Sequence, residues 1–95
     1  MITLPAALRP AQQARANTER GVASWFGAPA HTCAHRTLPF GTVIKVTMIS
    51  TGVSTECSVA DRGPSDMSRV IDLSTDTFEH LADTSVGLIE VVIEW

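Results

Sequence analysis

Residues 53–74 read VSTECSVADRGPSDMSRVIDLS, and this stretch decides the fold class. In its first part, Cys57 and Val59 alternate with polar residues, as they do in a strand with one buried face. Gly63-Pro64 then breaks the strand, because proline cannot donate a ladder hydrogen bond. Arg69–Leu73 reads as a second short strand. Two short strands with a tight break between them predict a β-rich domain.

The segments around this stretch carry the same signals. Three more read as strands from their β-branched content or their alternation, namely residues 21–27, 42–50 and 86–95. In the last of them, the residues expected to face inward are Ile89, Val91, Ile93 and Trp95. Residues 28–36 read as a loop.

One short helix is expected after the second strand. Ser74 suits the N-cap position, and the helix would run to about Ala82 with Phe78 and Leu81 against the core. About five or six short strands and one helix, with frequent turn signals, predict a small all-β closed barrel. Closure would also remove the exposed strand edges.

Composition excludes several classes of protein. The 95 residues suffice for one small domain, and 44% hydrophobic against 18% charged residues excludes a disordered chain. No apolar run approaches the ~20 residues of a membrane span. Seven Lys+Arg against ten Asp+Glu give a net charge of −3, and the cations are scattered, so nucleic acid is not an expected partner. With no Tyr and two Trp, an aromatic-lined ligand platform is not expected either.

The first 20 residues differ from the rest. Residues 1–20 read as a polar arm or linker, which we expect to dock on a neighbouring subunit, and residues 21–95 read as the domain. Met1–Arg20 contains no basic stretch followed by an apolar one, as a secretory signal would. Either a signal has been removed, or the protein leaves the cell by another route, such as lysis by a phage.

The two cysteines leave three alternatives open. Cys33 and Cys57 are 57 − 33 = 24 positions apart, and a disulfide between them would stabilise the fold by roughly 3 kcal/mol. That bond would place the protein in an oxidising compartment. The second alternative is a zinc site built from both cysteines with His31 and His35, whose residue types suit that metal. The third is two free thiols, and the prediction favours the disulfide without a metal.

Four segments resemble a known family in order and spacing. They are GVASWFG (21–27), AHRTLPFGT (34–42), VADRGP (59–64) and RVIDLS (69–74). Together they resemble the rare lipoprotein A (RlpA-like) domain over residues 21–95. The resemblance implies a six-stranded double-psi β-barrel, as in barwin, expansins and family 45 endoglucanases. It also implies binding to cell-wall glycans, which some members cut as lytic transglycosylases on strands that lack stem peptides.

The chain departs from the family pattern in one loop. Members usually have a longer loop after the Trp-Phe-Gly segment, with a Gly-Glu pair followed by an aromatic residue and an Asp. Here the loop is shortened to Ala28–Cys33 and holds no Glu. The enzymatic members use that Glu together with the Asp of the Asp-Arg-Gly-Pro motif. Only the second of these carries over, as Asp61.

Asp61 is therefore the candidate catalytic residue. It ends a strand beside a Gly-Pro loop, and desolvation there would favour the protonated carboxyl that a general acid needs. A lytic transglycosylase uses the sugar's own 6-hydroxyl as nucleophile, whereas a hydrolase needs two carboxylates at a set separation. The missing Glu thus argues more strongly against a hydrolase than against a lytic transglycosylase. The alternative is that Asp61 only shapes its own turn.

Four further residues are candidates for substrate binding, namely Trp25, His35, Arg62 and Asp72. His35 would orient Asp61 or, alternatively, cap a turn. Asp72 would pair with a nearby arginine or act as a second acid facing Asp61. Trp25 would stack on a sugar ring, and since neighbouring strand residues face opposite ways, at most one of Trp25 and Phe26 is expected to be exposed.

Two functions from different classes follow from these candidates. The first is a peptidoglycan-binding protein that cleaves glycan strands through Asp61 without a cofactor. The alternative is a non-catalytic module that binds another protein, either a component of a phage or envelope assembly or a protease inhibitor. Both place the protein outside the cytoplasm: secreted, periplasmic, in the cell envelope or in a phage particle.

Overall fold

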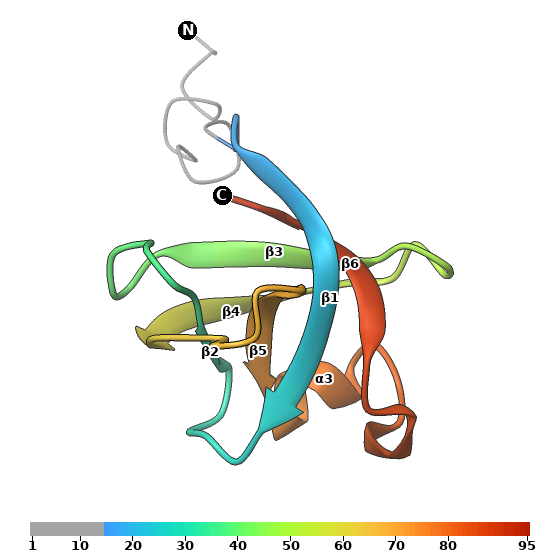
Figure 1. The fold of residues 1–95 in the computed structure, drawn as a ribbon. Helices are drawn as coiled ribbons and strands as arrows, with labels where there is room; N and C mark the ends of the chain where they lie inside the picture. Colours follow the sequence, from blue (N-terminus) through green and yellow to red (C-terminus); the bar gives the residue numbers. More distant parts are fainter. Residues whose placement is uncertain (1–14) are drawn as a thin grey trace, which may run out of the picture.

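The computed structural model describes residues 15–95, which form a closed barrel of six strands (Figure 1). The strands are β1 (Thr18–Phe26), β2 (Thr32–Ala34), β3 (Val43–Met48), β4 (Ser54–Asp61), β5 (Arg69–Ser74) and β6 (Ile89–Glu94). A short helix α3 (Thr75–Glu79) and a 3-10 turn η1 (Thr84–Val86) lie between β5 and β6. The predicted all-β barrel with one or two short helices is confirmed.

The order of strands around the barrel is β1-β5-β2-β4-β3-β6. Two of the pairs, β1–β5 and β2–β4, are parallel, and the others are antiparallel. Each parallel pair is formed by strands far apart in the sequence, so the connections must cross the barrel, as they do in a double-psi topology.

The core is made by the inward positions of the strands. Ile89, Val91 and Ile93 of β6 are buried as expected from the alternation. Phe78 is fully buried and Leu81 is 9% exposed, so both cover the barrel as predicted. The helix itself ends at Glu79, earlier than predicted, and the chain continues as hydrogen-bonded turns.

The boundary between the expected arm and the first strand differs from the prediction. β1 begins at Thr18, within the expected arm, because Thr18–Gly21 pair with β6. The expected docking of the arm concerns mainly residues 1–14, which lie outside the described part of the chain. Next to them, Arg15 binds Glu56 at 2.5 Å within the same chain.

The segment predicted as a loop contains a strand. β2 has three residues and no β-branched run, but it pairs with both β4 and β5. Its conformation is therefore set by its neighbours and not by local propensity.

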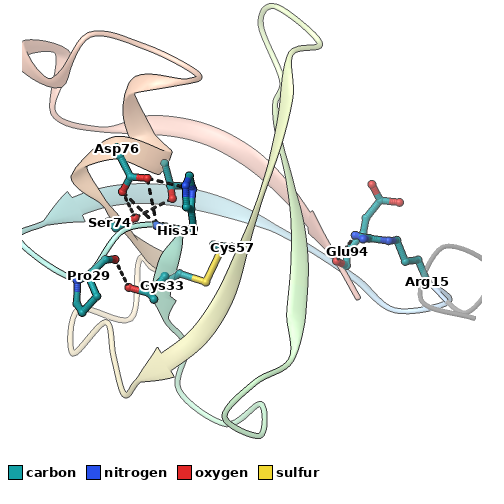
Figure 2. Close-up of a disulfide and its surroundings, with 10 residues drawn as sticks. Arg15, Pro29, His31, Cys33, Cys57, Ser74, Asp76 and Glu94 are labelled. Carbon is teal, nitrogen blue, oxygen red and sulfur yellow. Dashed lines mark hydrogen bonds and ion pairs between the residues drawn. A yellow bond between two sulfur atoms is a disulfide. The ribbon is translucent and has the colours of Figure 1, made fainter. Parts of the chain in front are cut away.

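Cys33 and Cys57 form a disulfide inside the barrel, with 5.8 Å between their Cα atoms (Figure 2). The predicted disulfide is confirmed, and the zinc and free-thiol alternatives are wrong because each sulfur is bonded to the other. The bond joins β2 to β4, next to the parallel pairing of these strands.

No helix within residues 15–95 has both the length and the hydropathy needed to cross a membrane.

Candidate functional site

Four residues line up across the outer face of the barrel. Cys33 points inward, so the next residue, Ala34, points to the outer side of the strand, where it is only 2% exposed because Gly63 lies over it. Ala34 pairs with Asp61 of β4 and with Asp72 of β5, and Asp72 pairs with Ser24 of β1. A register shift in the β2–β4 pair skips Ala60 and brings Asp61 opposite Ala34. We call Ser24, Asp72, Ala34 and Asp61 the outer row.

Asp61 lies at one end of the outer row and is exposed. Its Oδ1 accepts a hydrogen bond from the backbone N–H of Arg62 at 2.8 Å. The expected desolvation is not found, because β4 ends at Asp61 and the following loop leaves the carboxyl in solvent. The turn-shaping contact is present, and the same carboxyl is open to a ligand.

Asp72 is the half-buried carboxylate of the row. Its Oδ1 accepts a hydrogen bond from the hydroxyl of Ser24, and Arg69 donates to the same Ser24 oxygen at 3.2 Å. Arg69 is therefore the arginine expected near Asp72, and it contacts Asp72 only through the Ser24 hydroxyl. Gly63 passes over Asp72 with a φ of 139°, and a Cβ there would lie 3.5 Å from Asp72 Oδ2. The positive φ favours glycine at this position, whereas the contact with the carboxylate is an ordinary one.

His35 is only 6% exposed, and its ring lies against Glu19 and Trp95. Its Nδ1 accepts backbone N–H groups from Thr37 and Leu38, each at 3.2 Å. That assigns the proton to Nε2, which lies 3.3 Å from Glu19 Oε1. The structure matches the turn-capping alternative, and the link to Asp61 is a backbone one, from His35 N–H to the Asp61 carbonyl at 3.1 Å.

Arg62 follows Asp61 and links its own loop to the loop between β2 and β3 by hydrogen bonds. Its Nη1 donates to the carbonyls of His35 and Leu38, at 3.1 and 2.7 Å. Its guanidinium carbon lies 4.3 Å from the centre of the Phe40 ring, and Phe40 is 62% exposed. Composition argued against an aromatic platform, so Phe40 was missed, although it lies within the quoted AHRTLPFGT segment.

Trp25 lies next to Ser24, at the other end of the outer row. It is 38% exposed, and its indole N–H donates to the carbonyl of Thr84 at 3.0 Å. Phe26 is half-buried, so one of the two neighbouring aromatics is exposed, as expected. Because neighbouring strand residues face opposite ways, the Trp25 side chain lies on the other side of β1 from Ser24, so Phe40 is the exposed aromatic residue beside the row, at its Asp61 end.

Within residues 15–95 there is no group of three or more side chains suited to hold a metal ion. The chemistry of the outer row is that of two carboxylates, one exposed and one hydrogen-bonded, on either side of a small residue. Ser24 and Ala34 are buried, so a polymer on this face would reach the row at the exposed Asp61. Such an arrangement can bind hydroxyl groups and can donate or accept a proton.

The chain matches known proteins over most of its length. A family model described as lytic transglycolase matches residues 18–93. The endolytic peptidoglycan transglycosylase RlpA of Pseudomonas aeruginosa is 35% identical over 100 residues, a match that covers 90% of this chain and 29% of that protein. The chain spans less than a third of the length of the first curated relatives that it matches.

Two solved structures share the fold. An expansin from Clavibacter michiganensis, crystallised as a mutant with cellohexaose, superposes with a TM-score of 0.68 at 21% identity, covering 81% of this chain and 49% of the expansin. A Streptomyces papain inhibitor superposes with a TM-score of 0.66 at 18% identity, covering 83% of this chain and 94% of the inhibitor.

Proposed function

The chain belongs to the lytic transglycolase family, and on this premise we propose that it binds peptidoglycan glycan strands across the outer row and cleaves them. The observation that carries the proposal is the alignment of Asp61 and Asp72 on either side of Ala34, on one face and open at the Asp61 end. The name of the Pseudomonas relative supports the same substrate class.

In the proposed reaction, Asp61 is the general acid. Its carboxyl donates a proton to the glycosidic oxygen, and the bond from that oxygen to C1 breaks. The 6-hydroxyl oxygen of the same sugar bonds to C1, and its proton passes to the ionised Asp61. The product is a 1,6-anhydro sugar, and no water, metal or cofactor takes part. Asp72, held by Ser24, would bind a hydroxyl of the sugar and fix its position.

A second candidate function is binding without cleavage. It is favoured by the exposure of Asp61, since the carboxyl lacks the water-excluded surroundings of a typical general acid. The shortened loop between β1 and β2 also supplies no Glu. The protein would then hold glycan strands, or another protein, as part of an envelope or phage assembly or as a protease inhibitor.

In either function the protein would act in the cell envelope or outside the cell, where its ligand is found. The disulfide supports this localisation, because such bonds persist in oxidising compartments.

The test is cleavage of purified murein freed of stem peptides by an amidase. We expect 1,6-anhydro sugars by mass spectrometry with the native protein, and at least a hundredfold less, on the order of the contribution of a general acid, with Asp61→Asn. Asp83→Asn is the matched control, because Asp83 is exposed and only caps η1.

Unchanged product with Asp61→Asn would remove Asp61 as the acid. If the native protein releases no anhydro sugar but sediments with intact murein, the binding function replaces the catalytic one. If it does neither, the glycan proposal fails.

A further inference from the structure

A cavity of about 310 Å³ opens on the outer face of the barrel, apart from the outer row. Its lining residues are His31, Val43, Glu56, Cys57 and Ser58. They come from the loop before β2, from the first residue of β3 and from the middle of β4. None of them belongs to the outer row.

His31 is held in place at this cavity by Asp76. The backbone N–H of His31 donates to Oδ1 and Oδ2 of Asp76, with N···O distances of 3.2 and 3.1 Å (Figure 2). The ring Nδ1 of His31 lies 3.1 Å from Asp76 Oδ2. The backbone φ of His31 is 61°, a left-handed conformation that is costly for a residue with a side chain. The contacts to Asp76 stabilise that conformation and leave the side chain 70% exposed.

The second ring nitrogen of His31 is available to a ligand. Because Nδ1 faces the carboxylate of Asp76, the remaining donor or acceptor of the ring is Nε2. The ring also stacks on His80, with centres 6.3 Å apart and planes inclined by 12°, so its orientation is set from two sides. A fixed imidazole at a cavity wall is typical of a binding site.

The cavity lies on the same face as Asp61. Cys57 and Val59 point inward, so Ser58 between them points outward. The register shift that skips Ala60 turns Asp61 to this outer face as well. Ser58 and Asp61 are therefore neighbours along β4, about 10 Å apart at the strand rise of ~3.3 Å per residue.

We propose that the cavity is a second sugar subsite, which binds an N-acetylhexosamine unit further along the glycan strand that passes Asp61. This inference rests on the proposed function. His31 Nε2 and the Ser58 hydroxyl offer donors and acceptors for sugar hydroxyls, and Val43 offers an apolar wall for the C–H face. Glu56 adds an acceptor through Oε1, since its Oε2 binds Arg15.

The test measures how affinity depends on chain length. We titrate the whole protein with N-acetylglucosamine oligomers of two, four and six units by calorimetry. We expect tighter binding of the longer oligomers by the native protein. His31→Asn keeps a residue that tolerates the left-handed conformation, and Ser58→Ala removes one hydroxyl. Each change should weaken binding of the longest oligomer about five- to tenfold, as the loss of one hydrogen bond would. Neither change should alter the affinity for the dimer.

Ser54→Ala is the matched control, since Ser54 is on the same strand and outer face but outside the cavity. Native-like length dependence in both His31→Asn and Ser58→Ala would overturn the subsite and leave the proposed function intact. The same holds if the native protein binds murein with no gain from chain length. If it binds neither the oligomers nor murein, both proposals fail together.

Discussion

Phe40 is an exposed aromatic residue whose ring contacts Arg62, the residue that follows Asp61. Arg62 is anchored by two backbone carbonyls and lies against the Phe40 ring, which remains largely exposed. An exposed aromatic ring held by a cation is suited to stack on the C–H face of a sugar. Asp61 supplies the polar group of the same end of the row.

The change Phe40→Ala should therefore weaken glycan binding about three- to tenfold, corresponding to ~1 kcal/mol of aromatic contact energy. Phe40→Trp should retain the affinity, because it keeps an aromatic face. Calorimetric titration with N-acetylglucosamine oligomers measures both. Val53→Ala is the control, an exposed apolar residue in the turn before β4. Equal affinity of Phe40→Ala and the native protein would rule out stacking.

At the scale of elements, the parallel β1–β5 pair depends on a close approach at Gly21. A Cβ at Gly21 would lie only 2.3 Å from Val70 Cγ1, which is far inside the contact distance. Val70 is 7% exposed and belongs to the core, so it has little room to move. Glycine at this position is required by packing between the two strands.

We expect Gly21→Ala to lower the free energy of unfolding by about 1–3 kcal/mol through overpacking. The double variant with Val70→Ala should lose less than the sum of the two single changes, because the smaller partner makes room. Urea denaturation measures all three. Gly27→Ala, where a Cβ meets nothing within 4 Å, should change stability by less than about 0.5 kcal/mol. Strict additivity would contradict the clash.

At the scale of the whole molecule, three aspartates link stability to acid. The pKa of Asp76 is lowered mainly by the hydrogen bond from the Ser74 hydroxyl, with a further contribution from the His31 backbone N–H. Hydrogen bonds from Ser68 lower the pKa of Asp66, and hydrogen bonds from Ser85 lower that of Asp83. Each carboxylate is thus favoured in the folded state over the unfolded one.

Because these folded-state pKa values lie below the ordinary 3.8, their contribution to stability is present above pH 3.8 and is lost as the pH falls through the folded-state values. The urea concentration at the unfolding midpoint should therefore be lower at pH 3 than at pH 6. Asp76→Asn should make the difference between the two pH values smaller, since its side chain does not titrate. An unchanged pH dependence in Asp76→Asn would contradict the linkage.

Much of the fold could be predicted from the sequence because its signals are local. Alternation in β6 and β-branched residues in β3 mark strands wherever they pack, and two cysteines in a small chain favour one disulfide. β2 could not be predicted in the same way. Its three residues carry no strand signal, and the pairing with β4 and β5 comes from parts of the chain more than 20 positions away.

The same division applies to the candidate site. By itself the sequence determined the barrel class, the motif that contains Asp61 and the short loop without Glu, since these depend on residue type and order. Only the tertiary structure decided that Asp61 and Asp72 flank Ala34, that His35 faces Glu19 and that His31 borders a cavity. The reason is physical: strand register and a skipped residue determine which side chains share a face, and both arise from pairing between distant segments.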